Sequence, residues 1–281
     1  MIRFFHSVRK EDIPLVGGKG ANLGEMYGRF PVPNGFVVTT NAYRRFVDMR
    51  ELKEDMSDLL QKLDVGDHKN LNLISGKLKK LIMDEDILDE IVREIEAAMK
   101  KLKGTKFAVR SSATAEDLIT ASFAGQQDTY LNVKRQDIVN AVKKCWSSLF
   151  NPRAIYYRHE KKVSHDVAMA VVVQEMIDAE IAGVMFTVDP IRKKYILVEA
   201  AHGLGEQVVS GQVTPSSFMF ERKTFELKEK NITYDIEEGL MKKVAKLGLL
   251  IEAHYGRPQD IEFAIKDGKL HILQSRAITT L

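Results

Sequence analysis

Apolar residues recur at intervals of three and four between about residues 42 and 103, in a stretch that is otherwise heavily charged. Leu59, Leu60 and Leu63 show this spacing, which places apolar side chains along one face of an α-helix. Gly66 interrupts the pattern and indicates a break between helices. We therefore predict a scaffold of helices in this part of the chain, with a charged face toward solvent.

The pattern changes after Thr105, where short apolar runs rich in β-branched residues replace the helical spacing. Runs of this kind are typical of buried strands. One helix is expected within this part, between about residues 136 and 160. The expected strands include residues 167–174, 183–188 and 195–199.

The composition is that of a globular chain and excludes several classes of protein. Its 281 residues are 44% hydrophobic, and the formal net charge is +3. Because acids and bases are interspersed without a long basic tract, we expect no nucleic-acid partner. Cys145 is the only cysteine, which excludes an internal disulfide and a metal site of clustered cysteines. The first residues lack the apolar core of a signal peptide, and the longest apolar run is too short for a bilayer, so we expect a cytoplasmic protein without membrane contact.

An arginine followed by small and hydroxyl residues is the most distinctive local feature. Arg110 ends a short apolar strand and precedes Ser111 and Ser112, and a second strand is expected from Thr129, shortly after Gly125. Small residues let the backbone approach a ligand closely, and the guanidinium supplies a permanent cation with forked donors. The segment fits a lid over phosphate groups, and an ordinary surface loop between two strands fits it equally well.

Two further positions are candidates for a nucleotide site. Lys19 lies between Gly18 and Gly20 at the expected start of a helix, where backbone N–H groups and a lysine both favour anions. The glycine spacing differs from that of a Walker A loop, and a surface lysine has the same pattern. Gln174 ends an expected buried strand, where it can offer amide groups to a purine edge or simply terminate the strand.

Residues 260–276 contain the sharpest chemical pattern of the chain. Polar and apolar residues alternate over residues 260–265, as they do in a half-buried strand. Asp267 and Gly268 then form a turn signal, after which residues 270–276 run back. This segment therefore predicts a β-hairpin.

The length of the hairpin loop decides which polar residues meet. A two-residue loop would place Glu262 and Gln274 on opposite faces of the hairpin. A three-residue loop over residues 267–269 would place Glu262 opposite Gln274 and Asp260 opposite Arg276. We predict the three-residue loop, because it separates polar from apolar side chains better.

That register gathers two carboxylates, an amide and a guanidinium on one face. Carboxylate and amide oxygens suit Mg²⁺ that bridges nucleotide phosphates. The arginine can neutralise a phosphoryl oxygen during transfer. A ladder of salt bridges on a surface hairpin is the alternative, and the hairpin alone does not decide between the two.

Taken together, these segments resemble the nucleotide-binding N-terminal domain of phosphoenolpyruvate synthase and pyruvate phosphate dikinase. Rifamycin phosphotransferases and glucan water dikinases carry a domain of the same kind. No single matching stretch is decisive, but their order along nearly the whole chain is specific. The matching stretches are residues 17–23, 32–36, 109–113, 122–125, 183–187, 199–206, 260–263 and 273–276.

The resemblance implies an α+β architecture with the ATP-grasp fold, in which two lobes with antiparallel sheets enclose a nucleotide site. We expect the first lobe over residues 1–177, including the helical segment, and the second over residues 178–281, including the hairpin. Mg²⁺ would be the cofactor and ATP the substrate.

The resemblance also assigns roles to residues of this chain. Lys19 and Arg110 would contact phosphates, and Gly125 and Thr129 would lie in the loop that covers them. Gln174 would lie near adenine. In the hairpin, Glu262 and Gln274 would hold Mg²⁺ with support from Asp260, and Arg276 would act on the transferred group. Glu199 is a further candidate for the metal or sugar region.

One departure from the family pattern shapes the expected function. Full-length members pass phosphate through a histidine on a separate swivelling domain, and no histidine of this chain lies in such a setting. We therefore expect a stand-alone phosphotransferase module that donates a phosphoryl or pyrophosphoryl group from Mg-ATP to a histidine of a separate partner protein. The alternative is an ATP-binding regulatory or interaction protein without turnover.

Overall fold

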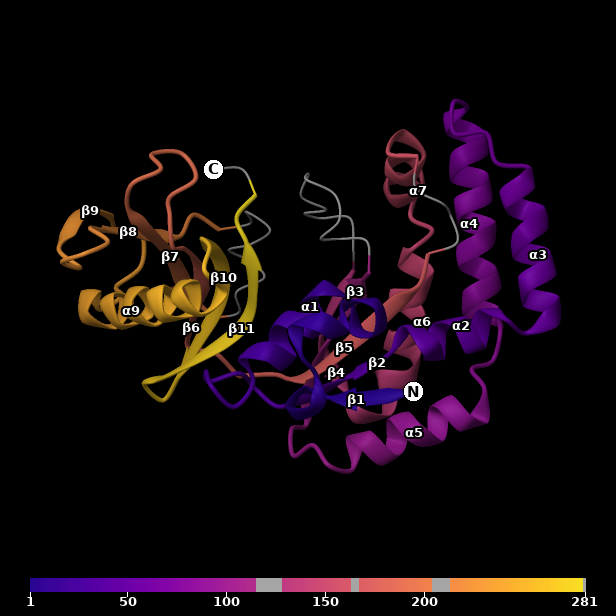
Figure 1. Cartoon of the computed structure of the whole chain (residues 1–281), viewed down its shortest axis with the longest axis horizontal. Helices are drawn as coiled ribbons and strands as arrows, with labels where there is room; N and C mark the ends of the chain where they lie inside the picture. The colour runs from indigo at the N-terminus through magenta and orange to yellow at the C-terminus, as the bar shows by residue number, and fades with distance from the viewer. Residues whose placement is uncertain (115–127, 163–166, 204–212, 280–281) are drawn as a thin grey trace. The chain divides into compact units, whose positions relative to one another are not determined.

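The computed structural model describes residues 1–114, 128–162, 167–203 and 213–279 (Figure 1). The chain forms two compact units. Unit 1 comprises Met1–Glu25 and Asn34–Met176, and unit 2 comprises Met26–Pro33 and Ile177–Leu281. The short segment Met26–Pro33 thus leaves the first unit and belongs to the second, although most of its sequence neighbours do not.

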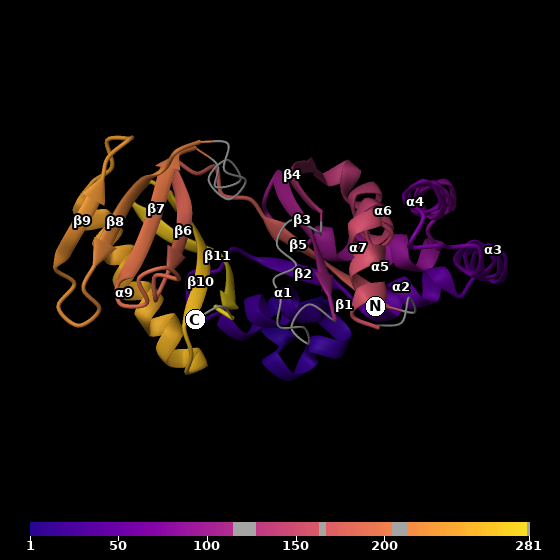
Figure 2. The ribbon, with the colours of Figure 1, turned by 90° about the horizontal axis from the view of Figure 1, so that it is seen from above.

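Unit 1 combines a five-stranded antiparallel sheet with helices (Figures 1 and 2). The strand order is β1-β2-β5-β3-β4. Its strands are β1 (Ile2–Phe4), β2 (Gly35–Val38), β3 (Lys106–Ala113), β4 (Thr129–Lys134) and β5 (Met169–Glu175). Its helices include α1 (Ile13–Met26), α2 (Thr40–Val47), α3 (Arg50–Gln61), α4 (His68–Asp84), α5 (Asp89–Met99), α6 (Ile138–Ser148) and α7 (Pro152–Glu160).

The two faces of this sheet have different partners. Side chains alternate between faces along a strand, so Val109 of β3 and Val171 of β5 share one face. Both are fully buried in a cluster with residues of α2, α4 and α6. The opposite face receives α1, because a Cβ at Gly20 would lie 3.1 Å from Val37 of β2. The sheet therefore has a helical core on one side and the lysine-bearing helix on the other.

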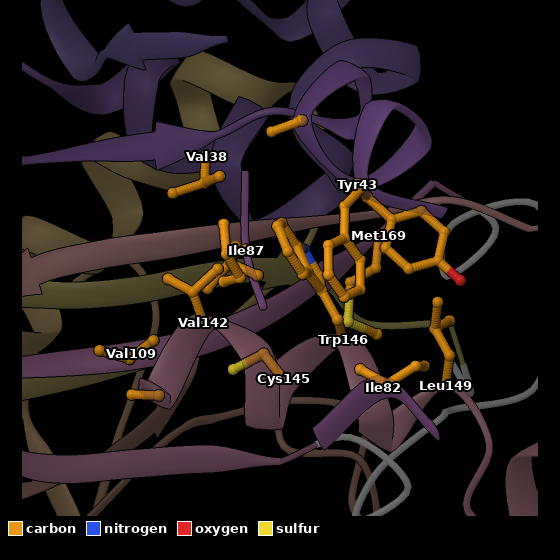
Figure 3. Close-up of a cluster of buried hydrophobic side chains, with 14 of the residues drawn as sticks. Val38, Tyr43, Ile82, Ile87, Val109, Val142, Cys145, Trp146, Leu149 and Met169 are labelled. Atoms are coloured by element: carbon orange, nitrogen blue, oxygen red, sulfur yellow. The ribbon is translucent and has the colours of Figure 1, made fainter. Parts of the chain in front are cut away.

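Trp146 lies at the centre of the helical core (Figure 3). It is fully buried, stacks on Phe46 with ring centroids 5.1 Å apart, and meets Tyr43 edge-on at 5.8 Å. Cys145 is also fully buried, and burial raises the pKa of its thiol far above its ordinary value. The cysteine therefore acts as a small apolar residue of this core.

The prediction of a single helix between about residues 136 and 160 is wrong. The structure has two helices there, α6 and α7, separated at residues 149–151. Pro152 is the first residue of α7. A proline is tolerated there because a backbone N–H at this position would make no hydrogen bond within the helix. The apolar spacing continues across the break, which is why it resembled one helix.

Unit 2 contains a six-stranded antiparallel sheet in the order β11-β10-β6-β7-β8-β9. Helix α9 (Glu238–Tyr255) packs against strands β6, β7, β8 and β10. On that side, a Cβ at Gly248 of α9 would collide with Met185 and lie 3.5 Å from Ile261. The strands are β6 (Ile181–Phe186), β7 (Ile196–His202), β8 (Ser216–Phe220), β9 (Leu227–Asn231), β10 (Gln259–Lys266) and β11 (Lys269–Ala277).

The helical core offers a stability test. Ile82 is fully buried beside Trp146 and Leu149 (Figure 3). Replacing it with valine leaves a methyl-sized void, so Ile82→Val should lower the free energy of unfolding by about 1 kcal/mol. Urea titration followed by the fluorescence of Trp146, the only tryptophan, measures this change. Ile191→Val is the matched control, because Ile191 is 89% exposed and its replacement should change little.

Candidate functional site

The hairpin of unit 2 turns on two residues, and the predicted three-residue loop is wrong. Lys266 pairs with Lys269, so that only Asp267 and Gly268 lie in the loop. Their φ angles are 50° and 67°, the left-handed conformation that a tight hairpin turn requires at both central positions. An aspartate followed by glycine tolerates this conformation at low cost, which explains the short loop.

A β-bulge nevertheless produces the predicted pairs. The register shifts between Glu262 and Phe263, because Phe263 pairs with Ile272 while Glu262 pairs with Gln274. Leu273 is thus the extra residue on β11, and it shifts the register by the one residue that the longer loop was predicted to supply. On the side of the bulge away from the turn, residues directly opposite each other on β10 and β11 share a face of the sheet. The four predicted hairpin residues therefore lie together, by a route that differs from the prediction.

Asp260 and Arg276 form the charged end of this group. Arg276 Nε donates to Asp260 Oδ2 at 2.7 Å, and Nη2 lies 2.7 Å from the same oxygen. The arginine side chain is 48% exposed and the aspartate only 11%. Burial raises the pKa of Asp260, and Arg276 opposes this effect without cancelling it. Asp260 therefore holds the guanidinium of Arg276 through one carboxylate oxygen, and part of the guanidinium stays accessible to solvent.

Glu199 lies on the same face as Glu262 and Gln274. Val184 of β6 pairs with Glu262 on one side and with Glu199 of β7 on the other, so these residues form one row across the sheet. This is the face opposite α9, since Ile261 alternates with Asp260 and Glu262 along β10. Burial raises the pKa of Glu199, and the nearby negative charge of Asp189 raises it further.

The raised pKa of Glu199 predicts a pH-dependent stability. At pH values above 4.5, the ordinary pKa of a glutamate, the carboxyl group of Glu199 keeps its proton more firmly in the folded protein than in the unfolded chain. The contribution of Glu199 to the free energy of unfolding therefore falls as the pH rises from 4.5 through the raised pKa. Glu199→Gln cannot ionise and should be more stable than the wild type at neutral pH, with the difference vanishing in acid. Urea titrations across this pH range measure it, and parallel curves for both proteins would contradict it.

The candidate residues of unit 1 share the sheet face that receives α1. Thr129 of β4 lies opposite Arg110, and Gln174 of β5 lies opposite Ala108, two residues before Arg110 on β3. Arg110 and Gln174 are buried, with exposed fractions of 6% and 1%, whereas Thr129 is exposed. The sheet thus places a cation and an amide, predicted separately, on one surface.

Helix α1 brings Lys19 to that same face. The helix is broken at Gly17, whose backbone has φ 68° and ψ 172°. Ser112 Oγ accepts a hydrogen bond from the backbone N–H of Gly20 at 3.0 Å and donates one to the carbonyl of Val16 at 2.8 Å. Sequence reasoning missed this role of Ser112, because its partners lie more than 90 residues away along the chain.

The predicted set is divided between the two units. Lys19, Arg110, Thr129 and Gln174 belong to unit 1, and Asp260, Glu262, Gln274 and Arg276 belong to unit 2. Gly125 lies outside the described residues. The distances and pairings given above therefore describe each group of four residues within its own unit.

The described residues contain no group of three or more histidine, cysteine or acidic side chains arranged for a metal ion. The predicted set differs from such a group, because it combines the carboxylate of Glu262 with the amide oxygen of Gln274. Hard cations such as Mg²⁺ accept both kinds of oxygen and take their other ligands from phosphates and water. The residues present thus fit the ion.

Comparison with known proteins gives the family. The family model described as "Pyruvate phosphate dikinase, AMP/ATP-binding domain" matches residues 13–238 and 228–281. The chain belongs to this family. Its α+β architecture with two antiparallel sheets agrees with the class expected for the family, and family membership supports the ATP-grasp fold.

Relatives within the family are longer than this chain. A probable phosphoenolpyruvate synthase of Archaeoglobus fulgidus is 46% identical over 98% of this chain and 41% of its own length. That of Methanothermobacter thermautotrophicus is 44% identical over 100% of this chain and 46% of its own. Rifampicin phosphotransferase of Bacillus subtilis is 38% identical over 98% of this chain and 36% of its own. The chain thus spans less than half the length of each.

Solved structures give a weaker match than these family relatives. D-alanine–D-alanine ligase of Bacillus anthracis matches with a TM-score of 0.32 and 9% identity, over 73% of this chain and 56% of the ligase. Within the described part of the chain, no helix combines the length and hydropathy needed to cross a bilayer.

Proposed function

We propose that this chain is the Mg-ATP-binding module of a phosphotransferase and donates a phosphoryl or pyrophosphoryl group to a histidine of a partner protein. The observation that carries the proposal is the bulge in the hairpin of unit 2. It sets Glu262 opposite Gln274 and Asp260 opposite Arg276, which a regular two-residue hairpin would not do. Family membership supports the nucleotide-binding part of the proposal.

The transfer step uses charge placement rather than covalent chemistry on this chain. An imidazole nitrogen of the partner attacks the γ- or β-phosphorus of ATP, and a nitrogen–phosphorus bond forms. The phosphorus–oxygen bond to the nucleotide breaks, its electron pair leaves on ADP or AMP, and the imidazole gives up its ring proton to solvent. Residues that hold positive charge near the moving group lower the barrier for this step.

Each residue of unit 2 then has a distinct task. Arg276 would offset the charge on the transferred group, and its accessible guanidinium is suited to that. Asp260 would hold Arg276 in place through the two contacts at 2.7 Å. Glu262 and Gln274 would hold Mg²⁺, which when bound would supply positive charge that offsets the charge of the phosphate groups.

The residues of unit 1 would bind the nucleotide. Lys19 and Arg110 would contact phosphates, because Arg110 lies on the sheet face that receives α1 and Lys19 lies on α1 itself. Thr129 would contribute to the phosphate-covering segment with Gly125. Gln174, buried at the end of the same face, would present its amide to the adenine edge.

Product analysis with labelled ATP tests the proposal. The acceptor is the intact Archaeoglobus fulgidus relative with its own counterpart of Arg276 replaced by alanine, so that it cannot use ATP itself. Label on a histidine of this acceptor, with ADP or AMP formed only when both proteins are present, would support the proposal. Tight ATP binding without label transfer or nucleotide cleavage would favour the alternative of a regulatory nucleotide-binding protein.

A further inference from the structure

Ser112 joins the two parts of unit 1 that carry the proposed phosphate-binding cations. It lies on β3 two residues beyond Arg110 and is fully buried. Its hydroxyl bonds α1 on both sides of the break at Gly17, through the N–H of Gly20 and the carbonyl of Val16. One side chain thus connects the strand of Arg110 to the helical turn of Lys19.

The break gives α1 a second beginning. Because Gly17 is not helical, the following stretch starts at Gly18 and places Lys19 and Gly20 in its first turn. First-turn N–H groups have no carbonyl partner within the helix. A side-chain oxygen of the residue before the first turn normally accepts one of them, but Gly17 has no side chain.

Gly17 cannot carry that cap itself. Its φ of 68° disfavours any residue with a Cβ, and a Cβ there would lie 2.2 Å from the carbonyl oxygen of Ser112. The cap therefore comes from strand β3. Ser112 Oγ accepts a hydrogen bond from the backbone N–H of Gly20, the third residue of the helical stretch. A local cap would fix only the helix, whereas this cap also fixes the helix to β3.

We propose that Ser112 is a positioning residue that sets Lys19 relative to Arg110 for phosphate binding. The inference rests on the proposed role of Lys19 in binding Mg-ATP. Ser112 acts through the backbone of Gly20 and Val16, and no contact of its own with the nucleotide is required. Its loss should matter for ATP only as long as Lys19 is present.

A double-mutant cycle with Mg-ATP as the probe tests this dependence. Ser112→Ala should raise the Kd measured by calorimetry about fivefold, the change reached when the full energy of a typical helix cap is lost in the ATP-bound state alone. In the Lys19→Ala background, the same substitution should raise the Kd less than about twofold. Ser148→Ala is the matched control, because Ser148 is also buried and bonds a carbonyl, that of Cys145, within α6.

The outcomes separate this inference from the proposed function. An equal effect of Ser112→Ala with and without Lys19 would overturn the positioning role but leave Lys19 as a ligand. An unchanged Kd for Lys19→Ala would overturn the role of Lys19 itself. A raised Kd in Ser148→Ala would show that a general loss of stability, rather than the position of Lys19, explains the effect of Ser112→Ala. If Ser112→Ala does not fold, Ser112→Cys keeps a side chain of the same shape, slightly larger and with weaker hydrogen bonds, and should show the same dependence on Lys19.

Discussion

Arg276→Ala should reduce phosphoryl transfer to the partner by on the order of 10³-fold or more while leaving the Kd for Mg-ATP nearly unchanged. The guanidinium is needed chiefly where charge develops during transfer, and other cations hold the ground-state phosphates. Rapid-quench measurement of acceptor labelling gives the rate, and calorimetry gives the Kd. Asp260 remains buried without its cation in this variant, so a small loss of stability should accompany the loss of transfer.

Arg45→Ala is the control for removing an arginine–carboxylate pair. Arg45 Nε lies 2.9 Å from Glu90 Oε1 on the surface of unit 1, with both side chains well exposed. Pairs of this kind contribute little, so both transfer and binding should stay at wild-type levels. Full transfer activity in Arg276→Ala would show that the assignment of Arg276 is wrong.

Glu262→Gln should lower the transfer rate by about 100-fold and shift its Mg²⁺ dependence to higher concentrations. The substitution keeps the shape of the side chain and removes the charge that a divalent cation needs most. Gln274 would remain as a neutral oxygen ligand opposite it. Transfer rates measured across a magnesium titration report both effects.

Glu180→Gln is the matched control in unit 2, at the residue immediately before β6. Glu180 pairs with Lys266 at 3.0 Å and accepts the N–H of Asp267 near the hairpin turn, away from the Asp260–Arg276 end. Its loss should leave the magnesium titration unchanged. If Glu262→Gln retained the wild-type magnesium dependence, the metal site would have to be sought elsewhere.

The hairpin shows how far local patterning reaches. The separation of polar from apolar residues correctly predicted the pairs Glu262–Gln274 and Asp260–Arg276, but not the pairs nearer the turn, where Phe263 lies opposite Ile272 instead of Leu273. It did not predict how the register arises, since a two-residue turn with a bulge at Leu273 and a three-residue turn satisfy the same pattern. The energy of the Asp267–Gly268 turn decided the loop length.

The helical part shows a second limit. Apolar spacing predicted helices over residues 42–103, and the structure has α2 to α5 there. The same spacing missed the separation of α6 from α7, because Pro152 can begin a helix as well as interrupt one. Periodicity thus reports which residues are buried more reliably than where each helix ends.

The sequence by itself determined the types of residue available for chemistry, the polar and apolar faces of the hairpin and the helical content of the first half. Only the tertiary structure decided that Ser112 caps the turn of Lys19, that Glu199 joins the row of Glu262, and that Arg110 and Gln174 share a face. The physical reason is sequence distance: partners such as Ser112 and Gly20 are 92 residues apart, and only strand pairing and helix packing bring them together.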